Sequence, residues 1–177
     1  MDFFIIITLP FLLTFVWAGK QGAPWVPSKS EDIDRFLSLT HLQPGQVFYD
    51  IGCGDGRFVS AAARAGARAY GFDISLLPYL LAKLRCLLSK TGARCHISYR
   101  NFWSTDLRDA DVVYFFLMPK IYPRLKEKFE RELKPGTKVV AYVWPIDGWT
   151  PVQISDVPNK PKLFLYEIQR NARIGHG

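Results

Sequence analysis

A glycine-rich segment, Gly52-Cys53-Gly54-Asp55-Gly56, follows an apolar run and constrains the fold of this chain more than any other feature. Glycine is needed where the backbone takes a positive φ or where a ligand approaches it without room for a side chain. A strand that ends in such a turn and leads into a helix presents backbone N–H groups to a small polar ligand. A second apolar run ends in Asp73, at about the spacing at which nucleotide-binding α/β folds place a ribose-binding acid. The glycines alone are typical of a tight turn, whereas together with Asp73 they favour a ligand site.

The spacing of the glycines argues against a dinucleotide site. A G-x-G-x-x-G fingerprint that starts at Gly52 requires glycine at position 57, and the chain has Arg57 there. In open α/β sheets, ligands lie beyond the carboxyl ends of the strands. We therefore expect a smaller ligand at that edge of the sheet.

Strand and helix patterns alternate along most of the chain. This alternation predicts an α/β fold with a Rossmann-like, doubly wound and mostly parallel seven-stranded sheet. The last two strands have no helix between them, so we expect an antiparallel C-terminal hairpin at one edge. Strands are predicted at 47–51, 69–73, 95–99, 112–117, 138–143, 152–156 and 163–169, and helices at 57–65, 76–91 and 121–133.

The chain begins with an apolar segment. Residues 3–18 carry no charge, and a helix over them would be roughly 24 Å long, slightly short of a bilayer core. Val16-Trp17-Ala18 resembles a signal-peptide cleavage site, but no Lys or Arg precedes the apolar run, which favours a retained hydrophobic helix. The predicted organisation is a transmembrane or membrane-anchor helix over 1–20, a linker and lead-in helix over 21–45, one α/β domain over 46–170 and a tail over 171–177.

The glycine segment and Asp73 resemble motif I and the following acid of the class I, or seven-strand, S-adenosylmethionine-dependent methyltransferases. The resemblance extends from about Val47 to Arg170 and implies S-adenosyl-L-methionine as the cofactor. Further motifs are similar to the membrane-anchored protein-lysine methyltransferases of mitochondrial inner-membrane proteins and to their prokaryotic relatives. These motifs are Trp25-Val26-Pro27-Ser28, Gly54-Asp55-Gly56-Arg57, Asn101-Phe102-Trp103, Phe116-Leu117-Met118-Pro119 and Leu133-Lys134-Pro135-Gly136.

The resemblance implies which residues hold the amino acid end of the cofactor. Asp50, Gly52 and Gly54 are expected to surround it, at the turn after the first strand. Cys53 lies in the same turn and belongs to the expected cofactor site. We interpret its side chain as a small buried residue rather than a nucleophile.

The resemblance also implies a nucleoside site. Asp73 is expected to accept hydrogen bonds from both ribose hydroxyls, and Ile74 to pack on the adenine. Asn101 and Phe102 lie where the family usually carries an acid followed by an aromatic residue. Asn101 is therefore either an adenine contact without charge assistance or a turn-forming residue.

A lysine substrate is favoured over a nucleic-acid amine. The chain lacks the Asn/Asp-Pro-Pro-aromatic signature of enzymes that methylate such amines. Neutralising a lysine costs roughly 4–5 kcal/mol at neutral pH, and a dry pocket with aromatic walls lowers this cost. No general base is identifiable, and no catalytic residue is predicted, because alignment of the amine with the donor accounts for much of the rate. Candidates for the substrate pocket, with ordinary core as the alternative for each, are Trp25, Phe116, Pro119, Tyr142 and Trp144.

The net charge indicates the kind of partner, and the cysteines indicate whether a metal site or a disulfide is expected. The net charge of +7 fits an anionic partner, and because the basic residues are scattered we favour a lipid surface over a nucleic-acid groove. Cys53, Cys86 and Cys95 lack metal-ligand spacing, so no metal site is predicted and all three are interpreted as free thiols in a reducing compartment.

These observations predict a membrane-anchored methyltransferase that modifies lysine of a membrane-associated protein. Positive charge after the anchor places the catalytic domain on the cytoplasmic side of the membrane. Two alternatives remain open: methylation of a lipid or another apolar small molecule, and an inactive cofactor-binding scaffold at the membrane. No particular oligomeric state is predicted.

Overall fold

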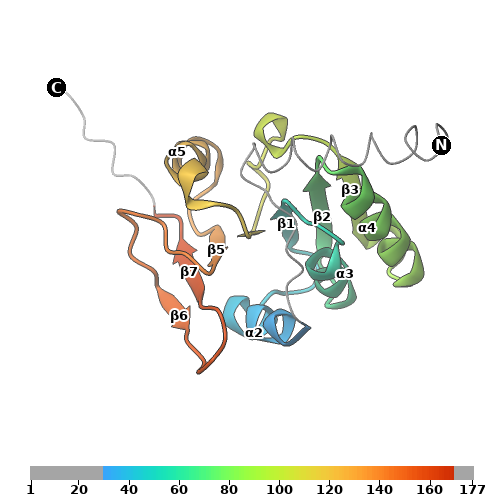
Figure 1. Ribbon diagram of the computed structural model, residues 1–177, viewed down its shortest axis with the longest axis horizontal. Coiled ribbons are helices and arrows are strands. Elements are labelled where there is room, and N and C mark those ends of the chain that lie inside the picture. Colours follow the sequence, from blue (N-terminus) through green and yellow to red (C-terminus); the bar gives the residue numbers. More distant parts are fainter. Residues whose placement is uncertain (1–29, 170–177) are drawn as a thin grey trace, which may run out of the picture.

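The computed structural model describes residues 30–169, whose elements are shown in Figure 1. The predicted anchor over 1–20, Trp25 and the tail over 171–177 lie outside these residues. Within 30–169, no helix combines the length and hydrophobicity that a bilayer span requires. The helices are α2 (Ser30–Thr40), α3 (Arg57–Arg64), α4 (Leu76–Leu88) and α5 (Tyr122–Glu132), with 3₁₀ turns η1 (Gly92–Arg94), η2 (Phe102–Ser104) and η3 (Pro119–Ile121). The strands are β1 (Val47–Ile51), β2 (Arg68–Asp73), β3 (Cys95–Tyr99), β4 (Val112–Phe115), β5 (Lys138–Tyr142), β6 (Gln153–Ser155) and β7 (Leu163–Glu167).

One seven-stranded sheet has the strand order β3-β2-β1-β4-β5-β7-β6. β1 pairs in parallel with both β2 and β4, so the strand order changes direction beside its carboxyl end. β7 is antiparallel to both β5 and β6. The predicted mostly parallel sheet with an antiparallel C-terminal hairpin is therefore confirmed.

Several strands end earlier than their apolar runs predict. β4 ends at Phe115, although the apolar run continues to Leu117. Leu117 is apolar because it is buried in the core beside α5, not because it extends the strand. β5 ends at Tyr142, because the next residue, Val143, has a φ of 75°, outside the range of a strand.

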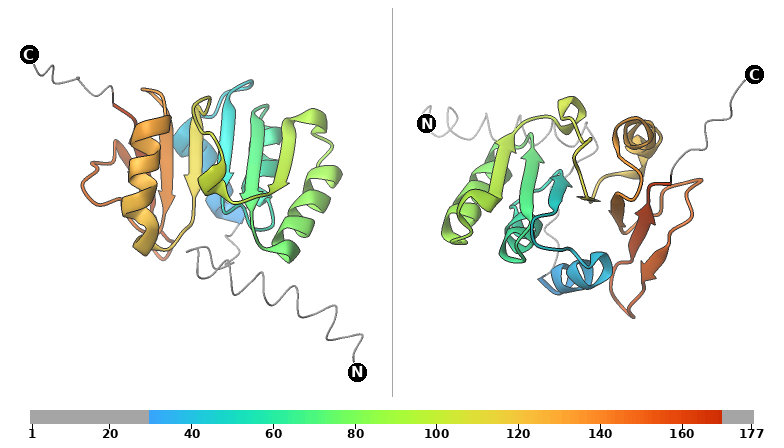
Figure 2. Two further views of the ribbon diagram at one scale, coloured as in Figure 1. Left: turned by 90° about the horizontal axis from the view of Figure 1, so that it is seen from above. Right: turned by 180° about the vertical axis from the view of Figure 1, so that it is seen from behind.

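Helices cover both faces of the sheet, with α2 and α3 on one side and α5 on the other (Figure 2). In the first layer, the fully buried Phe36 of the lead-in helix α2 lies with its ring centroid 5.3 Å from that of Phe48 and 5.4 Å from that of Phe58. In the second layer, Phe129 of α5 packs against Phe115 of β4. α2 is therefore part of the core of the domain.

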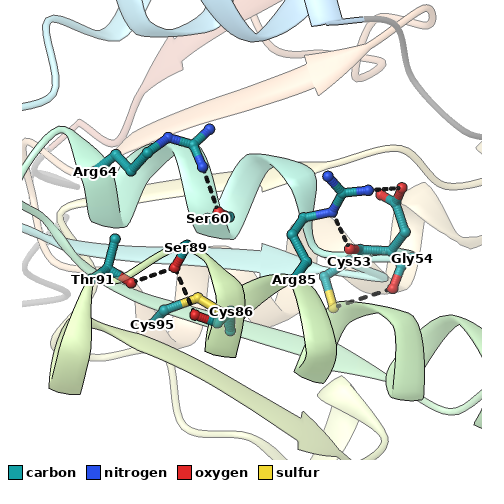
Figure 3. Close-up of a disulfide and its surroundings, with 10 residues drawn as sticks. Cys53, Gly54, Ser60, Arg64, Arg85, Cys86, Ser89, Thr91 and Cys95 are labelled. Carbon is teal, nitrogen blue, oxygen red and sulfur yellow. Dashed lines mark hydrogen bonds and ion pairs between the residues drawn. A yellow bond between two sulfur atoms is a disulfide. The ribbon is translucent and has the colours of Figure 1, made fainter.

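A disulfide joins Cys86, in the last turns of α4, to Cys95, at the start of β3 (Figure 3). The prediction that these two cysteines are free thiols is wrong. The pairing follows from the packing of α4 beside β3, which brings the two Cα atoms to 5.7 Å, within the range of a disulfide. Cys53 is free and buried, as interpreted from the sequence.

Gly56 is required both by its backbone and by its surroundings. Its φ is 71°, and a Cβ there would lie 2.8 Å from the Cβ of Ala82 in α4. We expect Gly56→Ala to lower the free energy of unfolding by about 3 kcal/mol, because it adds a clash to the cost of the left-handed backbone. Denaturant unfolding with circular dichroism measures the change.

Gly136→Ala is the matched control. Gly136 has a φ of 86°, but no atom of residues 30–169 lies within 4 Å of an added Cβ. This variant is expected to lose only about 1 kcal/mol, the cost of the left-handed backbone. Equal losses in the two variants would contradict a tight contact between the glycine turn and α4.

Candidate functional site

The turn after β1 takes its shape from three glycines. Gly52, Gly54 and Gly56 have φ values of 82°, 53° and 71°, all in the left-handed region. The N–H groups of Gly52 and Cys53 both donate to the carbonyl oxygen of Phe72 in β2, at 2.9 and 3.0 Å. The turn is therefore bound along its first residues to the neighbouring strand.

Asp73 joins this turn to the start of α4. Its Oδ2 accepts a hydrogen bond from the N–H of Gly54 at 2.9 Å, and its Oδ1 accepts one from the N–H of Ser75 at 2.7 Å. Burial raises the pKa of the Asp73 carboxyl, and the bonds from Ser75 and Gly54 oppose that rise. The carboxylate thus holds the ends of β1 and β2 in a fixed relation.

Asp50 carries a buried carboxylate oxygen without a partner. The residue is 2% exposed, and its Oδ1 has no hydrogen bond among the described residues. Burial raises the pKa of this carboxyl well above its ordinary value, and the negative charges of Asp73 and Asp55 raise it further. Buried polar atoms in native proteins nearly always have partners, so this oxygen indicates a place for a ligand that donates hydrogen bonds.

Asp55 is held by two arginines. Arg57 Nη2 lies 2.7 Å and Arg85 Nη2 2.8 Å from Asp55 Oδ2, and Arg85 Nε also donates to the Asp55 carbonyl oxygen at 2.9 Å. Figure 3 shows Arg85 extending from α4 toward Gly54. These bonds lower the pKa of the Asp55 carboxyl against the effect of its burial. Arg85 therefore fixes the glycine turn to α4, a role that sequence reasoning missed because Arg85 belongs to no motif.

Cys53 and Ile74 are buried beside the turn. Cys53 belongs to the core beneath α3, and burial raises the pKa of its thiol well above the ordinary value, which disfavours a nucleophilic thiolate. A Cβ at Gly71 would lie 2.8 Å from the Cys53 sulfur, so a glycine in β2 makes room for this side chain. Ile74 is 9% exposed and directly follows Asp73.

Asn101 has the turn-forming role that the sequence left open. Its Oδ1 accepts a hydrogen bond from the N–H of Trp103 at 3.1 Å and so caps η2. Phe102 is buried in the core on the α5 side of the sheet. Both residues follow β3, next to the strand that ends in Asp73.

The structure brings three of the substrate-pocket candidates together. Pro119 and Trp144 line a cavity of about 500 Å³ with residues of α5, and Phe116 stacks against Trp144 with a ring centroid separation of 5.9 Å. Val143, immediately before Trp144, is a β-branched residue in the left-handed region, a strained conformation that clusters at functional sites. Tyr142 is mainly structural, because its hydroxyl donates to Asp32 Oδ2 of α2 at 2.7 Å.

The cavity carries polar groups that the sequence did not indicate. Its lining includes three acids, Glu127, Glu130 and Asp147, and one base, Lys126, whose Nζ lies 3.9 Å from Glu130 Oε1. Tyr122, also in the lining, is 5% exposed, and its buried hydroxyl has no hydrogen-bond partner among the described residues. An apolar wall with carboxylates at its margin suits a long, partly apolar side chain that ends in a cation.

A family model described as the ANTKMT methyltransferase domain matches residues 50–153, more than half of the chain. The chain belongs to this family. A protein-lysine N-methyltransferase of Saccharolobus islandicus is 31% identical over 150 residues, which cover 82% of this chain and 93% of that protein. An adenine nucleotide translocase lysine N-methyltransferase of Mus musculus is 33% identical over 138 residues, covering 76% of this chain and 59% of that protein.

A solved structure is also similar over most of the domain. The RNA methyltransferase from Salinibacter ruber, in complex with S-adenosyl-L-homocysteine, has a TM-score of 0.78 and 28% identity, over 81% of this chain and 94% of that chain. Together with the family match, this similarity identifies a class I S-adenosylmethionine-dependent methyltransferase, with S-adenosylmethionine as its cofactor. The glycine turn fits such a cofactor, because a sulfonium and an ammonium group complement the buried carboxylate of Asp50.

The state of Asp50 has a measurable consequence for the stability of the ligand-free protein. We expect Asp50→Asn to raise the free energy of unfolding at pH 7 by about 1–3 kcal/mol, because the amide removes an uncompensated buried charge. The difference from the wild type should grow as pH rises above the ordinary carboxyl pKa, because a raised folded-state pKa makes ionisation oppose folding. Thermal unfolding across the acidic to neutral range measures this difference, and a variant less stable than the wild type at every pH would contradict it.

Proposed function

We propose that this enzyme transfers methyl groups from S-adenosylmethionine to lysine of a membrane-associated protein. The observation that carries the proposal is the cavity beside Pro119 and Trp144, at the carboxyl ends of β4 and β5, with its aromatic wall and acidic margin. The names of the two relatives support the transfer of methyl groups to protein lysine. The ammonium of a lysine side chain has the size and charge that such a cavity accommodates.

We assign the amino acid end of the cofactor to the turn after β1. Asp50 would accept from the cofactor ammonium group, which supplies the partner that its buried Oδ1 lacks. Gly52 and Gly54 allow the chain to turn there without side chains in the way, and Cys53 contributes through the packing of the turn rather than by chemistry.

We assign the nucleoside to the turn after β2. Asp73 would accept hydrogen bonds from the ribose hydroxyls, while the N–H groups of Gly54 and Ser75 hold its carboxylate in place. Ile74 would pack on the adenine. Asn101 Oδ1 accepts one hydrogen bond, from Trp103, and could accept a second from the adenine amino group. Phe102 supports this turn from the core.

The part of the site that binds the substrate lysine must lower the free-energy cost of removing the proton from its ammonium group. The cofactor supplies an electrophilic methyl group on its sulfonium. Phe116 and Trp144 would line the approach of the lysine with apolar surface, which favours loss of its proton. Glu127 and Asp147 at the margin of the cavity would attract the ammonium before it enters. Holding the amine in line with the methyl group then lowers the barrier further.

We also propose where in the cell the enzyme is located. The apolar segment 3–18 would anchor the chain in a membrane, with the catalytic domain on its cytoplasmic side. The test is extraction of the full chain from host membranes. Retention in the membrane pellet at alkaline pH is expected, and release together with peripheral proteins would contradict an anchor.

Loss of Asp73 should abolish tight cofactor binding. We expect Asp73→Ala to weaken the affinity for S-adenosylmethionine by roughly 100-fold, because it removes a charged acceptor and frees the glycine turn. Isothermal titration calorimetry measures the affinity. The matched control is Asp111→Ala. Asp111 also accepts a backbone N–H, from Val47 at 2.8 Å, but it lies at the amino-terminal ends of β1 and β4, away from the glycine turn. Equal effects in both variants would contradict a specific role for Asp73.

The substrate class is tested with radiolabelled cofactor and host membranes. We expect label in protein, at lysine by mass spectrometry, and none with the Asp73→Ala variant. Label in solvent-extractable lipid would instead support a lipid methyltransferase, and label in RNA would support the activity named for the Salinibacter protein. Cofactor binding without turnover in any fraction would indicate a scaffold, and each of these three results would overturn the lysine proposal.

A further inference from the structure

The helix α4 has its large apolar residues on the outside. Only Pro78 and Ala82 are buried among its residues, and both are small. Leucines recur at helical spacing on the outward side, whereas an ordinary surface helix turns such residues toward the core. The exposed fractions are 45% for Leu77, 46% for Leu80, 38% for Leu81, 52% for Leu84, 80% for Leu87 and 69% for Leu88. We call these six residues the α4 leucine face.

Polar and covalent links hold α4 in place instead of leucines. Arg85 binds Asp55 of the glycine turn, and the Cys86–Cys95 disulfide ties the last turns of the helix to β3 (Figure 3). Gly56 allows Ala82 to approach closely. The α4 leucine face is therefore not needed for the packing of the domain, and a contiguous exposed apolar surface of this kind marks an interaction site.

The segment that carries the α4 leucine face is basic. From Leu76 to Arg100 the sequence contains no Asp or Glu. Tyr79 of α4 packs against Tyr99 of β3, and Lys83 lies over the ring of Tyr79. Aromatic rings and cations beside exposed leucines are typical of helices that lie in a membrane interface. The exposed basic residues of this segment are Lys83, Lys90, Arg94 and Arg100, besides Arg85, which binds Asp55.

We propose that the α4 leucine face docks into the surface of an anionic phospholipid membrane. The leucines would enter the boundary between headgroups and acyl chains, while the basic residues of the segment bind lipid phosphates. A second copy of the chain fits less well, because a symmetric α4–α4 contact would oppose like charges without an acid in the segment to pair them. This proposal stands on the face itself and does not depend on the anchor or on the substrate.

Docking through α4 would set the orientation of the active site. α4 begins three residues after Asp73, near the carboxyl ends of the strands, where the glycine turn also lies. A helix of 13 residues is about 20 Å long, so the cofactor turn would lie within that distance of the lipid headgroups. A substrate residue close to the membrane surface would then be within reach.

Photo-crosslinking of the full chain distinguishes the possible occupants of the face. Benzoylphenylalanine replaces Leu87, or Ile154 of β6 as the control, which is 45% exposed at the other edge of the sheet. With phosphatidylcholine–phosphatidylglycerol vesicles, we expect about ten-fold more lipid adduct from position 87 than from position 154. Adducts to a second copy, adducts to the N-terminal residues of the same chain, or equal lipid labelling at both positions would each overturn the proposal.

Substitutions test the two components of the surface. Leu80→Gln with Leu84→Gln, read by the crosslinker at position 87, should reduce the lipid adduct about ten-fold, whereas the control Val152→Gln, at another exposed apolar residue, should leave it unchanged. Lys83→Gln with Lys90→Gln should reduce it several-fold, and vesicles of phosphatidylcholine alone should remove the effect of this charge change. Circular dichroism confirms that each variant is folded. Unchanged adduct in the folded leucine variant would overturn the proposal.

Discussion

The carboxylate of Asp73 is the interaction on which the rest of the site depends. It receives the N–H of Gly54 from one turn and the N–H of Ser75 from the next. The backbone bonds from Gly52 and Cys53 to Phe72 hold only the first residues of the glycine turn against β2. One residue that binds both turns fixes the glycine backbone and the first turn of α4 together. Arg85 adds a second connection, because its side chain binds Asp55 of the glycine turn from α4.

The site brings three carboxyl groups together in buried surroundings, where negative charge destabilises the ligand-free protein. Asp50, Asp55 and Asp73 lie close together, and burial raises the pKa of both Asp50 and Asp73. Of these three acids, only Asp55 has arginine partners within the described part of the chain, and they lower its pKa. In the proposed complex, a cationic cofactor would compensate these charges and so stabilise the folded protein.

The sequence predicted the sheet well because its signals are local. Apolar runs, the glycine turn and Asp73 each occupy a few consecutive residues, and β1 and β3 have the predicted bounds. The arrangement around α4 was not predictable in this way. The pairing of Cys86 with Cys95, the bond from Arg85 to Asp55 and the outward leucines all follow from how α4 packs on its neighbours. Periodicity even points the wrong way there, because a leucine stripe on a helix normally marks its buried side.

The same distinction applies to the substrate side. The sequence offered Phe116, Pro119, Tyr142 and Trp144 as pocket candidates, and the cavity joins Pro119 to Trp144. The hydroxyl of Tyr142 instead binds Asp32, a contact between residues far apart in the chain. The acids of the cavity lie on α5 and in the loop after β5, and no spacing rule connects them.

Hydrogen–deuterium exchange with and without S-adenosylhomocysteine can show whether the cofactor binds at the two turns that Asp73 joins, and it requires no substitution. We expect slower exchange at residues 50–56 and 73–76, where Asp73 joins the two turns, and no change in β6 and β7. Protection confined to the C-terminal hairpin, or to the cavity beside α5 without the two turns, would contradict it.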